Sequence, residues 1–183
     1  FPMASPLDGH LARGINGNFS LYVNPEGKRF VDETQPRNTI SQAILNQTNG
    51  ICYIICDQAN SGIVDGKATG GENIEFLKKI HAVYEADTIE ELAEQIGCDP
   101  ETLKATVEAY NKAAESYHDE EFGRTVFPEG CVIDEGPFYA CPRTPAVHIL
   151  LGGLTCAPTG EVISESNEAI PGLYAVGEVT VGG

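Results

Sequence analysis

A helical block lies in the middle of this sequence and limits how the rest can fold. "DTIEELAEQIG" begins with Thr88 as a helix N-cap, places Glu91 in the capping-box position and ends at Gly97. Asp99 then predicts a second N-cap, with Pro100 at the first helical position. Each helix carries a buried apolar stripe at helical spacing: Ile89, Leu92, Ala93 and Ile96 in the first, and Leu103, Val107, Tyr110 and Ala114 in the second.

Strand signals lie on both sides of this block. "FSLYVN" (19–24) and "KRFVDE" (28–33), joined by "PEG", predict a β-hairpin. "GICYIICDQ" (50–58) predicts a buried strand that ends at Asp57. After the block, strands are expected at 138–141, 147–151, 159–164 and 172–176, the last of them buried. The order of strands, helices and strands predicts an α+β fold rather than alternating βαβ units.

Short helices and polar loops account for the remaining segments. "TISQAILNQ" predicts a helix at 39–47 with Ile40 and Ile44 on one face, and a further helix is expected at 72–81. Loops are predicted at 1–18, 64–71 and 116–124. Cys52 and Cys56 lie within an apolar run, so we interpret them as core residues rather than metal ligands.

The composition excludes several classes of function. The 183 residues carry 11 Lys and Arg against 27 Asp and Glu, a net charge of -16, which argues against nucleic-acid or anionic-membrane partners. The six cysteines form no C-x-x-C pair and are too sparse for a disulfide scaffold. No apolar run approaches the ~20 residues that span a bilayer. The chain also contains no G-x-G-x-x-G, so no independent dinucleotide site is predicted.

Three stretches, in order, resemble one family. They are "VNPEGKRFVDETQPRNTISQAIL", "GPFYACPRTPAVHILLGGL" and "IPGLYAVGEVTVGG". Together they resemble the fumarate reductase and succinate dehydrogenase flavoprotein superfamily, in particular soluble fumarate reductases, urocanate reductases and 3-ketosteroid dehydrogenases. The resemblance covers about residues 13–183. It implies an FAD cofactor and a fold with the α+β capping domain of such flavoproteins, flanked by strands of the FAD-binding domain.

The resemblance also implies a domain organisation. Residues 1–35 would lead from the FAD-binding domain into the cap, residues 36–142 would form the capping domain, and residues 143–183 would begin the return into the FAD-binding domain. On this interpretation the chain is a fragment that lacks the glycine-rich ADP-binding loop. We therefore expect it to bind FAD weakly by itself and to be inactive alone.

The same resemblance assigns roles to individual residues. Arg37 holds the position of the arginine that donates a proton in similar fumarate reductases; the alternative is an arginine that forms a salt bridge or caps a helix. His148 and Arg13 match substrate-binding positions, the latter with three extra residues before "VN". Ile149 replaces a second histidine, which makes the pocket more apolar, and His10 falls where an acidic residue is expected.

Cofactor contacts are implied at four positions. Gly152 and Gly153 would let the backbone approach the flavin, because glycine has no Cβ. Gly177 and Glu178 match a turn whose acidic residue hydrogen-bonds the ribityl hydroxyls of FAD in similar flavoproteins. The alternatives are an ordinary β-turn at the glycine pair and an exposed turn glutamate.

The implied activity is reduction of the C=C bond of an α,β-unsaturated carboxylate, with hydride from flavin and a proton from Arg37. The partners would be a small-molecule substrate and an electron donor that the sequence does not identify. Two alternatives stay open: a 3-ketosteroid dehydrogenase-like enzyme, and a non-catalytic interaction domain derived from a flavoprotein. The compartment also stays open between the cytoplasm and the bacterial cell envelope or periplasm.

Overall fold

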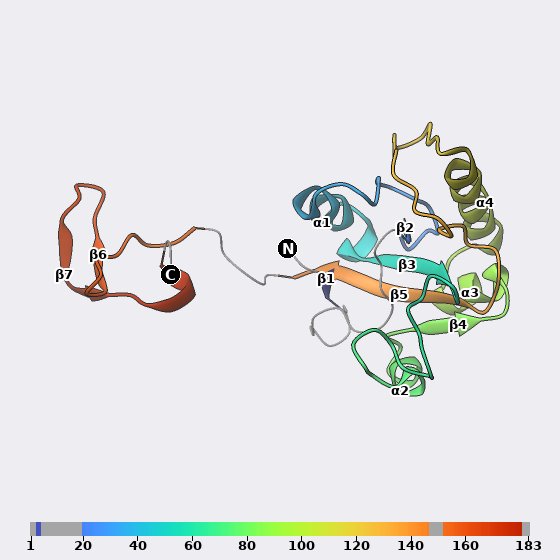
Figure 1. Cartoon of the computed structure of the whole chain (residues 1–183), viewed down its shortest axis with the longest axis horizontal. Helices are drawn as coiled ribbons and strands as arrows, with labels where there is room; N and C mark the ends of the chain where they lie inside the picture. Colours follow the sequence, from blue (N-terminus) through green and yellow to red (C-terminus); the bar gives the residue numbers. More distant parts are fainter. Residues whose placement is uncertain (1–2, 5–19, 147–151, 181–183) are drawn as a thin grey trace. The chain divides into compact units, whose positions relative to one another are not determined.

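The chain forms two compact units, residues 1–146 and 147–183, in a computed structural model (Figure 1). The structure describes residues 3–4, 20–146 and 152–180. Arg13, His148, the strand expected at 147–151 and most of the loop expected at 1–18 lie outside these residues. Within the described ranges, none of the helices has the length and apolar character needed to cross a bilayer.

The first unit is built on an antiparallel sheet centred on two strands. β5 (Phe138–Pro145) pairs along its length with β3 (Cys52–Asp57), with Ile54 opposite Cys141. β2 (Leu21–Val23) lies on the outer side of β3. The other edge of β5 pairs with β4 (Tyr84–Ala86) and, near its end, with β1 (Met3–Ala4).

Helices cover both faces of this sheet. Ile55 packs on one face with the apolar stripes of α3 (Ile89–Ile96) and α4 (Pro100–Ser116). Its neighbour Ile54 packs on the other face with α1 (Arg37–Leu45) and α2 (Ile74–Lys79) (Figure 1). Because successive strand residues point to opposite faces, a strand covered on both sides needs an unbroken apolar run. This explains "ICYIIC" and confirms the predicted buried strand, including Cys52 and Cys56 as core residues.

The local helix signals are confirmed. Thr88 Oγ1 accepts a hydrogen bond from Glu91 N at 3.2 Å, and Gly97 ends α3 with a φ of 79°. Asp99 Oδ2 accepts from Thr102 N at 2.9 Å at the start of α4. α1 begins two residues before the predicted start, and α2 is shorter than predicted, with Asn73 as its N-cap. A short 3-10 turn, η1 (Thr48–Gly50), follows α1.

The hairpin predicted at 19–33 forms only at its turn, where Asn24 N donates to Lys28 O at 2.9 Å, and its second strand is absent. β2 pairs with β3, and only an isolated bridge joins Val23 to Arg29. Residues 29–33 leave the sheet because Arg29 and Glu33 are drawn into a buried ion network described below. The loop prediction was also incomplete, since residues 3–4 form β1 and the exit after α4 contains the buried Asp119. The short strand β4 was not predicted.

The second unit is a two-stranded sheet with flanking turns. β6 (Glu161–Ile163), predicted within 159–164, pairs with β7 (Ala169–Tyr174), and η2 (Gly177–Val179) follows. The expectation of a buried final strand is wrong, since every residue of β7 is exposed. A single pair of strands has no second layer to cover it, and Val162 is the buried apolar residue of the part of this unit that the structure describes.

Candidate functional site

Arg37 is the first residue of α1, and its side chain is exposed. The helix is anchored behind it by Ile40 and Ile44, which are buried in the core. Pro36 is the N-cap and forms no side-chain cap, and no acidic residue follows in the first turn. Among the residues that the structure describes, no ion pair involving Arg37 is present, so the alternative role in a salt bridge has no support there.

The charge of Arg37 is unfavourable for the helix that carries it. The N-terminus of a helix bears a partial positive charge, so cations are preferred at the other end. An exposed cation at this position, without a carboxylate to offset it, adds nothing to the stability of α1. The position instead presents the guanidinium charge and the positive end of the helix to an anion.

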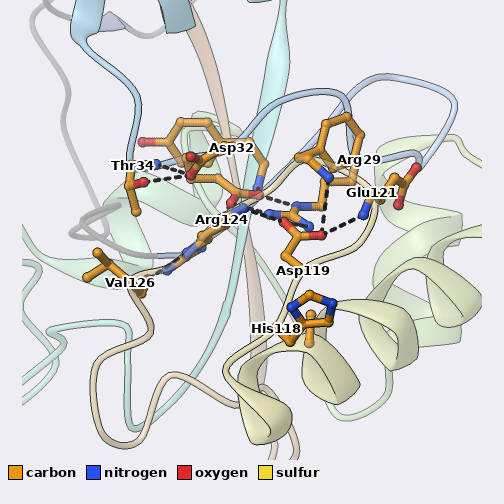
Figure 2. A network of polar contacts seen from close by, with 12 residues as sticks. Arg29, Asp32, Thr34, His118, Asp119, Glu121, Arg124 and Val126 are labelled. Atoms are coloured by element: carbon orange, nitrogen blue, oxygen red, sulfur yellow. Dashed lines mark hydrogen bonds and ion pairs between the residues drawn. The ribbon is translucent and has the colours of Figure 1, made fainter.

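Two residues shortly before Arg37 in the chain, Arg29 and Glu33, belong to a buried ion network (Figure 2). The Glu33 carboxylate is fully buried and accepts two hydrogen bonds from Arg29, Nε to Oε1 at 2.8 Å and Nη2 to Oε2 at 2.9 Å. Arg124 Nη1 donates to the same Oε2 at 2.9 Å. Glu33 therefore joins two guanidinium groups, one of them 91 positions away in the sequence.

Asp119 supplies the second buried carboxylate. Its Oδ2 lies 2.8 Å from Arg29 Nη1 and accepts from Arg124 N at 3.2 Å. The Tyr110 ring lies 5.7 Å from the Arg29 guanidinium carbon and 5.4 Å from that of Arg124. Each buried guanidinium group thus contacts a carboxylate and the face of an aromatic ring instead of water. Buried charges are stable only with such partners.

Electrostatics in this region lower the pKa of two carboxyl groups, those of Asp119 and Asp32. Burial alone would raise the pKa of Asp119, but backbone hydrogen bonds from Phe122 and the charge of Arg29 lower it below its usual value. Burial would also raise the pKa of Asp32, but hydrogen bonds from Thr34 and Gln35 lower it below its usual value. The pKa of Arg29 is raised: burial lowers it, but bonding to Glu33 outweighs that effect.

A groove of about 890 Å³ runs along α4 in the same unit. Lys28, Thr102, Ala109 and His118 are among the residues that line it. Arg37 is not among the lining residues, so this groove is not built around the predicted catalytic arginine.

In the second unit, the fold brings together two of the glycine-containing stretches. Leu154 N donates to Val179 O at 2.8 Å, and Leu154 forms a parallel bridge with Thr180. A Cβ on Gly153 would overlap the carbonyl oxygen of Val179. The predicted cofactor residues Gly152 and Gly153 therefore lie beside the turn that holds Gly177 and Glu178.

These residues leave open backbone and an exposed carboxylate on the surface of the unit. A Cβ placed on Gly152 or on Gly177 would meet nothing within 4 Å, which leaves the backbone open to a ligand. Gly177 has a φ of 79°, a conformation that side chains disfavour. The carboxylate-bearing Glu178 is exposed in η2, where it can accept hydrogen bonds from ribityl hydroxyls.

The two glycines of the pair predict different results on substitution. Gly153→Ala should remove the protection of the Leu154 amide in hydrogen exchange, because the new methyl group collides with the Val179 backbone. Gly152→Ala is the matched control, since its methyl group would enter open space. Equal protection of Leu154 in both variants would contradict this packing.

Asp119 and Arg124 were not predicted as site residues, because they lie in the segment 116–124, which was expected to be a polar loop. The available signal was weak: an acidic segment, "HDEEFGR", that holds a lone arginine two residues after Phe122. Arg29 and Glu33 carried a clearer signal, because "RFVDE" spaces opposite charges four residues apart in an apolar setting.

The α+β unit and the glycine turns together are those of a flavoprotein. The chain belongs to the FAD binding domain family, whose model matches residues 2–183. FAD is therefore the cofactor to which the family points, and Gly152, Gly153, Gly177 and Glu178 are candidate residues for holding it.

Several oxidoreductases are similar to this chain. An NADH:acrylate oxidoreductase of Vibrio harveyi is 39% identical over 184 residues, which is 99% of this chain and 18% of that protein. A fumarate reductase (cytochrome) of Shewanella frigidimarina is 35% identical over 172 residues, 94% of this chain and 28% of that protein. A urocanate reductase of Eggerthella lenta is 33% identical over 161 residues, 88% of this chain and 26% of that protein.

Solved structures agree with this family. The open conformation of a flavocytochrome c3 fumarate reductase matches with a TM-score of 0.73 at 30% identity, over 92% of this chain and 29% of that chain. A 3-ketosteroid delta1-dehydrogenase of Sterolibacterium denitrificans matches with a TM-score of 0.66 at 22% identity, over 98% of this chain and 37% of that chain, which shows a shared fold. The chain thus spans a minor part of the length of each relative.

Proposed function

We propose that this chain is part of a longer FAD-dependent oxidoreductase that reduces the C=C bond of an α,β-unsaturated carboxylate. The carrying observation is Arg37, an exposed cation at an uncapped helix N-terminus. The proposal is supported by the similarity to oxidoreductases whose names specify acrylate and fumarate, which are both α,β-unsaturated carboxylates. Residues 36–142 would then act as the capping domain, between the segment 1–35 and the incomplete FAD-binding segment 143–183.

The chemistry divides between cofactor and protein. When bound, reduced FAD supplies a hydride, two electrons with one proton, to one carbon of the C=C bond. Arg37 gives a proton to the other carbon, so that the double bond becomes a CH–CH single bond and the guanidinium becomes neutral. Because arginine holds its proton tightly, a relay must return a proton from solvent after each turnover.

Arg37 also binds the substrate's charge in this proposal. A guanidinium can hold a carboxylate with two parallel hydrogen bonds, and the α1 N-terminus adds positive potential beside it. His148 and Arg13 are proposed to contact the substrate as well, with Ile149 giving the pocket an apolar side. These positive groups would stabilise the enolate charge that develops as hydride arrives.

The test uses the visible spectrum of the full-length flavoprotein. We expect dithionite to bleach the flavin and anaerobic acrylate, fumarate or urocanate to restore its absorbance. A saturated 3-ketosteroid should leave the oxidised flavin unchanged. Bleaching of oxidised flavin by the steroid, without reoxidation by any enoate, would replace the proposal with a 3-ketosteroid dehydrogenase-like function. A protein that binds no FAD and shows neither response would indicate the non-catalytic alternative.

A further inference from the structure

A hydrogen-bonded turn directly precedes Arg37 and is organised by one carboxylate. Asp32 Oδ1 accepts from Thr34 N at 2.8 Å and from Thr34 Oγ1 at 2.7 Å (Figure 2). Its Oδ2 accepts from Gln35 Nε2 at 2.9 Å, and its backbone carbonyl accepts from Gln35 N at 3.2 Å. Asp32 therefore fixes the path of the chain across the next three residues.

This turn is fixed at its start. The next residue, Glu33, has its carboxylate held by Arg29 and Arg124 in the buried network. Asp32 itself is 6% exposed. The turn thus begins from a part of the unit that long-range ion pairs hold in place.

The turn is also fixed at its end. Pro36 restricts its own φ to -54°, and its carbonyl accepts from Thr39 N and Ile40 N as α1 begins. Ile40 and Ile44 then pack α1 into the core. Arg37 consequently lies between two anchored elements, and the Asp32 turn sets where its backbone emerges.

The four residues from Thr34 to Arg37 contribute little to the core. Thr34, Gln35, Pro36 and Arg37 are all exposed, so ordering them buries almost no apolar surface. Ordering an exposed segment costs conformational entropy, which packing does not offset here. The turn is therefore better explained by the residue that it places than by stability alone.

We propose that Asp32 is a positioning residue that sets the orientation of Arg37 through the 32–35 turn. This inference rests on the proposed function, in which Arg37 protonates the substrate. A displacement of about 1 Å in a reacting group is enough to cost about 100-fold in rate. Loss of the turn should therefore lower kcat more than it changes KM for the carboxylate substrate.

The test compares three variants of the full-length, FAD-loaded protein, with acrylate and fumarate as substrates. Asp32→Ala removes every side-chain bond of the turn and should lower kcat per bound flavin by about 10- to 100-fold. Asp32→Asn retains an oxygen that accepts from Thr34 N and Oγ1, so it should restore most of the activity. Thr34→Val removes the bond from Thr34 Oγ1 to Asp32 at an exposed position, so it tests the turn even if Asp32→Ala does not fold.

Asp99→Ala is the matched control. Asp99 Oδ2 also accepts from a backbone N–H and a threonine hydroxyl, those of Thr102, but at the start of α4. Both alanine variants should lower the melting temperature, while only Asp32→Ala should lower kcat. If Asp32→Ala and Thr34→Val keep kcat per flavin within about twofold of wild type, as Asp99→Ala does, the inference is overturned.

This outcome is distinguishable from failure of the proposed function. If no enoate reoxidises the reduced wild-type flavin, the proposed function itself is wrong. If Arg37→Ala retains turnover, the assignment of Arg37 as proton donor is wrong and the role of Asp32 falls with it. If Arg37→Ala is inactive while the Asp32 variants remain fully active, only the positioning role is wrong.

Discussion

Replacing Arg37 with alanine should abolish C=C reduction in the full-length flavoprotein while leaving FAD bound. Proton donation by a positioned side chain contributes about 10²- to 10⁴-fold in rate, so a loss of at least 100-fold in kcat is expected. Stability should not fall, because the variant removes a cation from a helix N-terminus, where it costs about 0.3–1 kcal/mol. Stopped-flow reoxidation of the reduced flavin and a thermal melt measure the two effects.

Two further variants sharpen this prediction. Arg37→Lys keeps the charge but loses the planar fork, so it should still bind the substrate carboxylate but should protonate the carbon of the C=C bond poorly. Lys79→Ala is the control. It removes an exposed cation from the C-terminal end of a different helix, α2, and should leave turnover unchanged. Turnover in Arg37→Ala close to that of the Lys79 variant would show that another group donates the proton.

The second large effect is expected in the ion network. Glu33→Gln should lower the free energy of unfolding by about 3–5 kcal/mol, because it removes the buried carboxylate charge that Arg29 and Arg124 share. The network contacts β2 through Tyr22 N, α4 through the Tyr110 ring, and the segment before α1 through Glu33 itself. Urea denaturation followed by circular dichroism gives the change in free energy.

An exposed ion pair serves as the control. Glu90 Oε1 lies 2.6 Å from Lys104 Nζ, and both side chains are more than two-fifths exposed, at 41% and 47%. Glu90→Gln makes the same chemical change in water, where solvent screens the charges, so the unfolding curve should stay unchanged. Similar curves for the two variants would mean that the buried network is not a major source of stability.

The helices were predictable because their signals are local. Thr88, Gly97 and Asp99 act through hydrogen bonds to residues within about one turn, so the sequence alone shows where α3 and α4 begin and end. The apolar run of β3 was equally clear, because a strand covered on both faces tolerates no polar interruption.

The second strand of the predicted hairpin is absent for the opposite reason. β-type residues at 28–33 suggested a strand, but Arg29 and Glu33 find their partners in Asp119 and Arg124, about 90 positions further along. Pairing over that distance leaves no periodic pattern in the sequence. The same holds for β4 and β1, which are defined by their pairing with β5 rather than by their own residues.

The candidate site divides in the same way. The sequence by itself determined which residue types are present: an arginine after "RFVDE", a glycine pair, a glycine–glutamate turn, and the family to which they belong. Only the tertiary structure decided that Glu33, in the segment before Arg37, is held by the distant Arg124, and that Gly153 must lack a side chain because Val179 lies against it. Hydrogen bonds within a few residues are encoded locally, whereas close approach of distant backbones exists only once the chain has folded.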